Sequence, residues 1–226
     1  MDADLVKREG SSMARYTGPV CRLCRRQGEK LYLKGDRCYT QKCSFEKRPH
    51  PPGPRSTRRR KISDRGLQLR EKQRARATYG LLERQFVRYY NEAVRQPGVS
   101  GANLVRILES RLDNIVYRTG FANSRNQARQ MVRHGLIALN GKKADIPSIM
   151  LREGDAVAFT ERGQRSELFA ILKEGVASKT IPDWLNLDVS AMSANVGAPP
   201  LVARGETHNF NAVSYTHLTL PTNREV

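Results

Sequence analysis

The feature that most limits how this chain can fold is a cluster of four cysteines near its N-terminus. They are Cys21, Cys24, Cys38 and Cys43, and the 226-residue sequence has no others. A Cys-x2-Cys turn brings two thiolates to one ion, and a second close pair completes a tetrahedral shell. The spacing therefore predicts a small module folded around one structural zinc ion, with no open metal position for catalysis.

Three other uses of these cysteines stay open: an iron–sulfur cluster with the same thiolate ligands, two disulfides, or four unrelated buried residues. Disulfides fit poorly because residues 1–10 lack the apolar segment of a secretory signal. No apolar run approaches the ~18–20 residues that a membrane-spanning helix needs. We therefore expect a cytoplasmic protein that binds zinc, with an iron–sulfur centre as the second choice.

The charge of the chain points to a polyanionic partner. Lys and Arg number 40 against 22 Asp and Glu, which leaves a net charge of +18. Because such a surplus opposes compaction by self-repulsion, it is typical of proteins that bind nucleic acid or, as a second candidate, an anionic membrane surface. Between residues 46 and 76 there are twelve Lys or Arg against three acids, which is half of the excess.

This basic stretch begins with a proline-rich linker over 48–54, where the prolines lack the N–H that helices and ladders need. Good helix formers after Leu67 predict a helix with one densely cationic face, preceded by a flexible arm over 56–61. The competing interpretation is a disordered arm or a solvated helix face.

Two apolar stripes predict further helices. The first spans 82–93 and stops at Pro97-Gly98, and its aromatic residues are expected in the core rather than under nucleic-acid bases. The second runs from 104 to 116 and stops at Gly120. It places Asp113 in the middle of a helix.

The clearest helix start is Ser124-x-x-Gln127, a capping box, and Gly135 is the expected stop. Three arginines recur along one side of this helix, at Arg125, Arg129 and Arg133. Like charges at this spacing repel by roughly 0.2–0.5 kcal/mol per pair. Three in a row therefore favour an anion outside the helix over a merely solvated face.

A hairpin should follow, because Asn140-Gly141 is a strong two-residue turn signal. It predicts strands over 136–139 and from Lys142 onward, with another strand over 155–160 after the Glu153-Gly154 turn. Helix and hairpin together are expected to form one compact recognition unit with basic residues along one edge.

Several motifs, taken in order, closely resemble bacterial small-subunit ribosomal protein number four, in its zinc-binding four-cysteine branch. The similarity covers residues 13 to about 188. The motifs are Met13-Ala14-Arg15-Tyr16-Thr17-Gly18-Pro19, the four cysteines, Pro49-His50-Pro51-Pro52-Gly53, Arg70-Glu71-Lys72-Gln73, Tyr79-Gly80, Leu108-Glu109-Ser110-Arg111-Leu112-Asp113-Asn114-Ile115-Val116-Tyr117, Ala128-Arg129-Gln130-Met131-Val132-Arg133-His134-Gly135 and Pro182-Asp183-Trp184-Leu185.

The resemblance implies a mainly helical α+β fold in three parts. These are a four-cysteine zinc module over 13–50, a basic arm and helical rRNA-binding domain over 51–110 that 176–200 rejoins, and a small α-helix/β-hairpin RNA-binding domain over 111–175. Residues 1–12 precede the similar segment as an extension. Residues 201–226 do not match the family, and because 214–222 resembles a translated sequencing adaptor we expect this tail to be disordered or artefactual.

The resemblance also implies a function, that of a structural constituent of the small ribosomal subunit and not an enzyme. Family members bind the 5′ domain of small-subunit rRNA, nucleate assembly of the subunit body, and lie near the mRNA entry path, where they affect accuracy. The expected partners are this rRNA, neighbouring ribosomal proteins, especially number five, and mRNA as a further candidate. No membrane or small-molecule substrate is expected.

Two RNA-binding surfaces are predicted, which should read A-form RNA through its shape and backbone. The first consists of Arg58, Arg59, Arg60, Lys61, Arg65, Arg70, Lys72 and Arg74, and the second of Arg125, Arg129, Arg133 and Lys142. On this view Arg129→Glu should weaken RNA binding without lowering thermal stability.

Two alternatives remain. Arg111-Leu112-Asp113 resembles the motif with the catalytic aspartate of RNA pseudouridine synthases, although the chain after 175 is too short for a synthase domain. The other alternative is a non-ribosomal RNA-binding regulator with the same domains, which a match along most of the chain disfavours.

Overall fold

A computed structural model describes residues 15–54, 63–176 and 179–198. The predicted N-terminal extension, the arm over 56–61 and the tail over 201–226 therefore lie outside the described residues. The same holds for four residues of the first predicted RNA surface, which are Arg58, Arg59, Arg60 and Lys61.

The N-terminal module consists of short elements around a small core. They are α1 (Cys21–Gln27), a 3-10 turn (Gly35–Cys38) and α2 (Ser44–Lys47). Cys24, Leu31 and Leu33 are buried here, and Ala77 from the next domain packs against them. Gly35 lies so close to the loop of the C-terminal domain that an added Cβ would stand 2.4 Å from the Asn123 carbonyl oxygen. The module is thus seated against both of the other parts.

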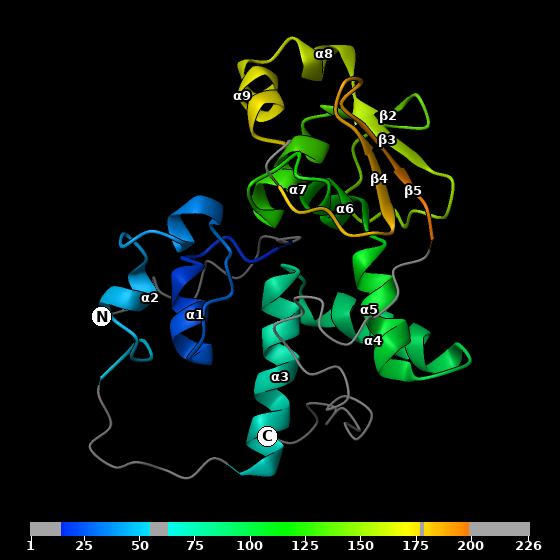
Figure 1. The fold of residues 1–226 in the computed structure, drawn as a ribbon. Helices are drawn as coiled ribbons and strands as arrows, with labels where there is room; N and C mark the ends of the chain where they lie inside the picture. Colours follow the sequence, from blue (N-terminus) through cyan, green and yellow to red (C-terminus); the bar gives the residue numbers. More distant parts are fainter. Residues whose placement is uncertain (1–14, 55–62, 177–178, 199–226) are drawn as a thin grey trace, which may run out of the picture.

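The helical domain follows, with α3 (Asp64–Thr78), α4 (Glu83–Arg95) and α5 (Ser100–Glu109). Ser63 caps the start of α3, because its hydroxyl accepts from the Gly66 N–H at 3.3 Å. Phe86 and Leu108 are fully buried in the core between α4, α5 and the end of α3. Figure 1 shows α3 standing beside α1 on one side and α5 on the other.

The C-terminal domain packs helices against one antiparallel sheet. Its elements are α6 (Leu112–Arg118), α7 (Arg125–Arg133), β1 (Ile137–Leu139), β2 (Lys142–Ala144), β3 (Ala156–Phe159), α8 (Glu161–Gln164), α9 (Glu167–Val176), β4 (Leu185–Asp188) and β5 (Ser193–Val196). The strand order is β2-β1-β3-β5-β4, with Ile137 opposite both Ala144 and Phe159. One core joins α6, α7, α9 and the sheet (Figure 1). The α+β class and the predicted hairpin are confirmed.

The described residues 179–198 do not rejoin the helical domain, contrary to the prediction for the segment 176–200. Its strands β4 and β5 extend the sheet of the C-terminal domain, because β5 pairs with β3 in the register Val157 opposite Ala194. Burial explains the preference: Trp184, Leu185 and Val196 enter the core of this domain. The sheet of the C-terminal domain therefore has five strands, β4 and β5 in addition to the predicted hairpin and the predicted third strand.

The apolar stripe over 104–116 is also not one helix. Helices α5 and α6 are separated at Ser110 and Arg111, and Arg111 is extended, with φ −72° and ψ 139°. It forms a β-bridge with Met150, and the Leu112 N–H donates to the Ile149 carbonyl at 2.9 Å. Asp113 therefore lies in the first turn of α6, and not in the middle of a helix as predicted.

None of the described helices is both long and apolar enough to cross a bilayer.

Candidate nucleic-acid interface

Helix α3 divides its predicted RNA-binding residues between solvent and the protein interior. Arg65 and Arg70 are exposed. Lys72 is only 6% exposed and forms an ion pair with Glu83 at the start of α4. Arg74 pairs with Glu29 of the N-terminal module and with Glu71 at 2.9 Å. Of this set, the two exposed arginines are the ones placed to meet a phosphate.

The three arginines of α7 are divided in the same way. Arg125 donates through Nε to the Asn114 Oδ1 at 2.8 Å, and its guanidinium lies 4.9 Å and 4.5 Å from the ring centres of Tyr79 and Tyr117. Arg129 donates to Asp113 Oδ2 at 3.1 Å. Arg133 is exposed. The repulsion along this stripe is thus relieved in part by partners inside the protein.

Helix α7 begins where the capping box predicts. The Ser124 hydroxyl accepts from the Gln127 N–H at 3.3 Å, and the Gln127 side chain accepts from the Asn123 N–H at 2.9 Å. The helix directs Arg133 toward solvent, and Lys142 of β2 is exposed as well. Arg133 and Lys142 therefore remain the outward cations of the second predicted surface, and their binding to RNA stays a prediction.

Asp113 is the anchor of a buried cluster that the charge pattern of the sequence does not reveal. It accepts from Arg111 through both carboxylate oxygens, at 3.0 Å and 2.7 Å, and Arg111 is 0% exposed. Arg111 also donates to the Tyr89 hydroxyl at 2.6 Å. Because two guanidinium groups enclose this carboxylate, it is not open to a substrate as the aspartate of a synthase would be.

Glu109 forms the second buried cluster, at the boundary between the helical and C-terminal domains. It accepts from the Tyr79 hydroxyl at 2.5 Å, from Asn114 at 2.6 Å and from Arg118 at 2.8 Å and 2.9 Å. Burial alone would raise the pKa of Glu109, but the charge and hydrogen bonds of Arg118 outweigh it and lower the pKa to about 2. Burial and the nearby Glu109 charge raise the pKa of Tyr79.

The four cysteines lie in the N-terminal module, and they are free thiols. Cys24, Cys38 and Cys43 are buried, and Cys21 is half-buried. Burial is the main reason that the pKa of Cys24 is raised, and Cys38, Cys21 and Cys43 raise it further. Within the described ranges there is no group of three or more His, Cys, Asp or Glu side chains arranged to ligate a metal ion. Zinc binding by the four thiols therefore stays a prediction.

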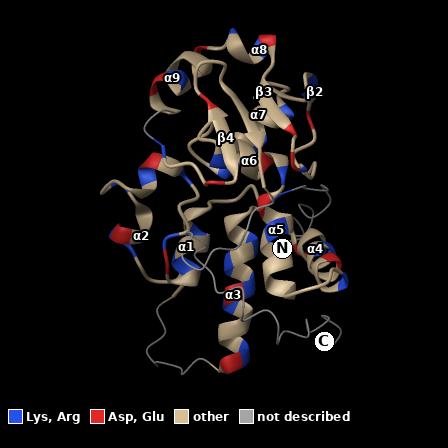
Figure 2. Ribbon diagram, turned by 45° about the vertical axis from the view of Figure 1, so that its right-hand side comes forward, with Lys and Arg blue, Asp and Glu red and all other residues tan. Residues whose placement is uncertain are grey.

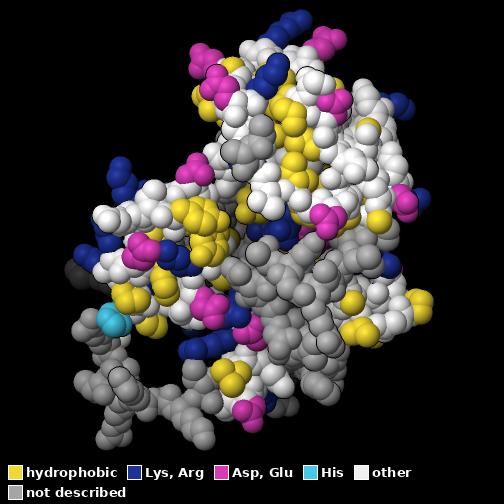
Figure 3. Space-filling view, in the orientation of Figure 1, with side chains coloured by type: hydrophobic (Ala, Val, Ile, Leu, Met, Phe, Trp, Pro, Cys, Tyr) yellow, Lys and Arg dark blue, Asp and Glu magenta, His cyan; other side chains and the backbone are white. Residues whose placement is uncertain are grey.

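Basic and acidic side chains alternate over the visible surface rather than forming one uniform field. Figure 2 shows Lys and Arg recurring along α3, with acidic residues among them. Figure 3 shows carboxylates between the cations and a patch of hydrophobic side chains over the N-terminal module. Affinity for a polyanion would therefore depend on particular outward arginines and lysines.

A feature that sequence reasoning missed is a cavity of about 830 Å³ between α1 and α3. Its lining comes from separated segments, among them Tyr16, Leu23, Arg26, Gln73 and Arg125. No local pattern could have joined them, because Tyr16, the residues of α1, Gln73 of α3 and Arg125 of α7 come from separate stretches of the chain.

Comparison with known proteins covers most of the chain. Residues 15–109 match the family model described as the ribosomal protein S4/S9 N-terminal domain, and 110–157 match the S4 domain. Three relatives named small ribosomal subunit protein uS4 align over 188 residues, which is 83% of this chain and 90% of each relative. They come from Heliobacterium modesticaldum, Pelotomaculum thermopropionicum and Nitratidesulfovibrio vulgaris and are 58%, 53% and 51% identical.

Proposed function

Because the chain belongs to the family of small ribosomal subunit protein uS4, we propose that it is a structural, rRNA-binding component of the small ribosomal subunit. The single observation that carries this conclusion is the match of both family models in succession over 15–157. The protein is then not an enzyme, and its place is in the cytoplasm, within the ribosome.

The exposed cations support binding through the phosphates of the RNA backbone. Arg65 and Arg70 on α3 and Arg133 and Lys142 on the C-terminal domain face solvent. Such residues bind phosphates and release counterions, so affinity falls steeply with salt. A-form RNA hides its base edges in a deep groove, so backbone shape is the expected basis of recognition.

A binding titration tests this role. The full chain is titrated against a transcript of the small-subunit rRNA 5′ domain and against an unrelated structured RNA of equal length. We expect binding to the 5′ domain to be tighter by about a hundredfold or more, because specific sites exceed non-specific electrostatic binding by a wide margin. Equal affinity for both RNAs would contradict the assignment.

We further propose that Cys21, Cys24, Cys38 and Cys43 bind one structural zinc ion. Four free thiols on one small module are the donor set of a structural zinc site. The Lys34 N–H lies 3.4 Å from the Cys38 sulfur, and the Leu31 backbone also hydrogen-bonds to Cys24, which are contacts that favour thiolate. When bound, the ion supplies cross-links between α1 and the turn before α2.

Metal analysis separates zinc from the iron–sulfur alternative. Protein purified without chelator should contain about one zinc per chain and show no visible absorption, whereas an iron–sulfur cluster absorbs in the visible range. Zinc removal by a chelator should lower the melting temperature, and Cys43→Ser should do the same. Thr40→Ser, a change close to Cys43 but not at a thiol, is the control. A metal-free protein of unchanged stability would contradict the proposal.

Finer roles are proposed on the resemblance alone: nucleation of subunit assembly, contact with small-subunit protein number five, and a position near the mRNA entry path. Order-of-addition reconstitution tests the first of these. We expect omission of this protein to prevent later proteins of the subunit body from joining the 5′ domain. Cross-linking in purified small subunits tests the neighbouring protein and the mRNA.

A further inference from the structure

The cavity between α1 and α3 has the size and lining of a ligand site. Its volume is about 830 Å³, within the ~300–1,000 Å³ typical of small-molecule pockets. The lining comes from the N-terminal module, the linker at Pro51 and Pro52, helix α3 and the start of α7. It therefore lies where the three parts of the protein meet.

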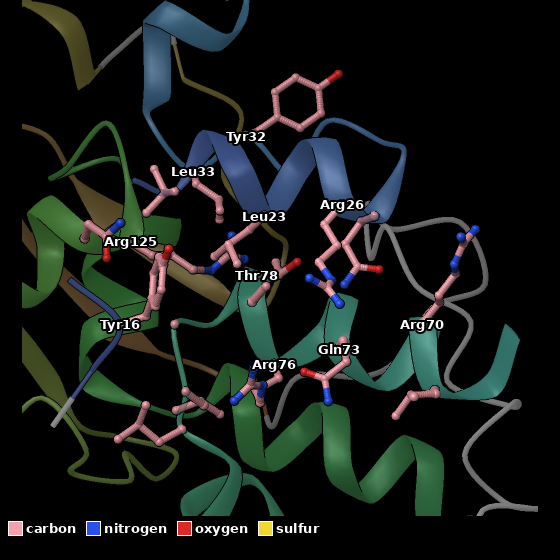
Figure 4. A pocket seen from close by; sticks show the side chains of 18 of the residues that line it. Tyr16, Leu23, Arg26, Tyr32, Leu33, Arg70, Gln73, Arg76, Thr78 and Arg125 are labelled. Carbon is pink, nitrogen blue, oxygen red and sulfur yellow. The ribbon is translucent and has the colours of Figure 1, made fainter. Parts of the chain in front are cut away.

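The lining separates into an apolar end and a cationic end. Figure 4 shows Tyr16, Leu23 and Leu33 gathered at one end, close to Arg125. Toward the other end, Arg26 extends from α1 toward α3, with Gln73 facing it and Arg70 farther along α3 (Figure 4). A ligand that fits both ends has a flat apolar part and an anionic part.

The cations of this cavity differ in how far the protein already uses them. Arg125 is engaged by Asn114 and by two tyrosine rings. Arg26 and Arg70 are exposed and form no ion pair with a described residue. Arg76 also lines the cavity, and its Nε is the one buried side-chain nitrogen or oxygen of the described residues without a hydrogen bond, with Glu83 Oε2 3.7 Å away. Arg26 and Arg70 are therefore available to an anion.

We propose that this cavity binds one unpaired nucleotide of a single-stranded RNA segment. The base enters the apolar end beside Tyr16, Leu23 and Leu33, and its phosphate meets Arg26 and Arg70. Gln73, between the two ends, has an amide that can both donate and accept at a base edge. Protein sites that recognise RNA sequence commonly take unstacked bases in this way, with aromatic or arginine side chains against the base.

The chemistry of the cavity favours RNA over other anionic ligands. An inorganic phosphate would leave the apolar end unfilled, and an apolar molecule would leave Arg26 and Arg70 without a partner. Arg65 and Arg70, the two exposed cations of α3, suit the phosphates of the rest of a strand. The inference rests on the proposed function, since it assumes RNA as the partner.

The test compares two ten-nucleotide strands of equal charge. One is oligoadenylate with a central 2-aminopurine, and the other has an abasic ribose at every position. The full chain should bind the base-bearing strand about tenfold more tightly, as expected for insertion and stacking of one base. The fluorescence of the 2-aminopurine should change on binding.

A matched pair of variants locates the effect. Gln73→Trp fills the cavity, whereas Gln68→Trp adds the same side chain to α3 at a half-buried position outside the lining. Gln73→Trp should bring the two strands to equal affinity and leave abasic binding unchanged, while Gln68→Trp should retain the tenfold preference. A thermal melt of each variant checks that α3 still packs.

Each remaining outcome is decisive. A base preference that survives in Gln73→Trp overturns the nucleotide site, and so does equal binding of both strands by the unmodified protein. Saturable binding of free AMP as tight as that of the base-bearing strand overturns RNA as the source. None of these results tests the proposed binding to small-subunit rRNA. That proposal is contradicted only if the titration shows no preference for the 5′ domain.

Discussion

Glu109 and Asp113 determine how the helical and C-terminal domains meet. Glu109 at the end of α5 contacts Tyr79, Asn114 and Arg118, and Asp113 at the start of α6 contacts Arg111 and Arg129. Both carboxylates are almost fully buried. A buried charge with several matched hydrogen bonds is costly to disturb, because removal of one partner leaves the others uncompensated. These two side chains therefore fix the orientation of the C-terminal domain relative to the helical domain.

Asp113→Asn should destabilise the protein strongly. Arg111 is 0% exposed and would lose its counter-charge, which typically costs about 3–5 kcal/mol for a buried pair. Urea unfolding followed by circular dichroism measures the change. Asp145→Asn, at an exposed position, is the control and should change the free energy of unfolding by less than about 0.5 kcal/mol. A loss in Asp113→Asn as small as in the control would contradict the role of the pair.

Glu109 should make stability depend on pH in the acid range. Burial opposes ionisation, but Arg118 and the hydrogen bonds lower the pKa of Glu109 from 4.5 to about 2. A lowered pKa stabilises the fold above pH about 4.5, and this stabilisation is lost as the pH falls toward 2. The difference in unfolding free energy between the unmodified protein and Glu109→Gln should shrink by about 3 kcal/mol from pH 5 to 2.

Denaturant titrations at several pH values measure this difference. Glu153→Gln, an exposed glutamate, serves as the matched control and should follow the unmodified protein throughout. If the curves of Glu109→Gln and the unmodified protein stay parallel down to pH 2, the carboxylate does not ionise as described.

Helix α7 combines two tasks on one stripe of arginines. Its capped start fixes the direction of the helix, so that Arg125 and Arg129 turn toward the boundary with α6 while Arg133 faces solvent. Arg129 thus holds α7 to α6 within the C-terminal domain, and Arg125 also contacts Tyr79 of the helical domain. Arg133 forms no ion pair with a described residue and faces solvent, so it is available to a partner outside.

Arg129→Glu and Arg133→Glu should separate these tasks. At 129 the new carboxylate would lie beside Asp113, so we expect a lower melting temperature, contrary to the expectation from the sequence that stability would be unaffected. At 133 stability should persist, while the affinity for the 5′-domain transcript falls several-fold because a phosphate contact is lost. Melts and filter-binding titrations of both proteins measure the two effects. Equal melting temperatures would contradict the inward role of Arg129.

Across the molecule, only some of the basic side chains behind the net charge of +18 are available to bind RNA. Lys72, Arg74, Arg111, Arg118 and Arg129 are partly or fully engaged by internal carboxylates. Arg74 links the helical domain to the N-terminal module through Glu29, and Arg118 links the C-terminal domain to the helical domain through Glu109. The salt dependence of RNA binding should therefore reflect only the outward subset.

Arg65→Gln and Arg74→Gln test this division on one helix. The first removes an exposed charge and should lower the slope of log affinity against log salt by roughly 0.7–0.9. The second removes a charge paired with Glu29 and Glu71, and should leave the slope nearly unchanged while lowering stability. Titrations between 50 and 300 mM salt, about the usual working range for such slopes, measure both. Equal reductions in slope would contradict the division.

Local signals in the sequence were sufficient to predict the elements that begin at a capping residue or end at a characteristic turn. Ser124 and Gln127 predicted the start of α7, and Asn140-Gly141 predicted the turn between β1 and β2. The break at Arg111 was missed because the apolar period continues through it, and only the bridge to Met150 reveals it. Strand β4 did carry a signal, the alternation of Leu185 and Leu187 with polar residues, but its pairing is set by distant partners.

The candidate site was less accessible to prediction than the fold. Residue type and spacing showed which arginines could meet phosphate, yet whether each one does depends on carboxylates supplied from elsewhere in the chain. Asp113 and Arg129 are 16 positions apart, and Tyr89 and Arg111 are 22 apart. Ion pairs and hydrogen bonds at such separations follow from tertiary packing, which no local pattern encodes.

The position of β3 at the middle of the sheet has a consequence for synthesis of the chain on a ribosome. Its neighbour β1 precedes it, but its other neighbour, β5, is made only after α8, α9 and β4. Until then one edge of β3 lacks its partner, and its unpaired backbone groups can join another strand. The N-terminal module and helical domain have been synthesised by residue 110, so they can fold before residues 193–196 of β5 are made. Nascent chains stopped between 160 and 190 should therefore be the ones most prone to aggregate.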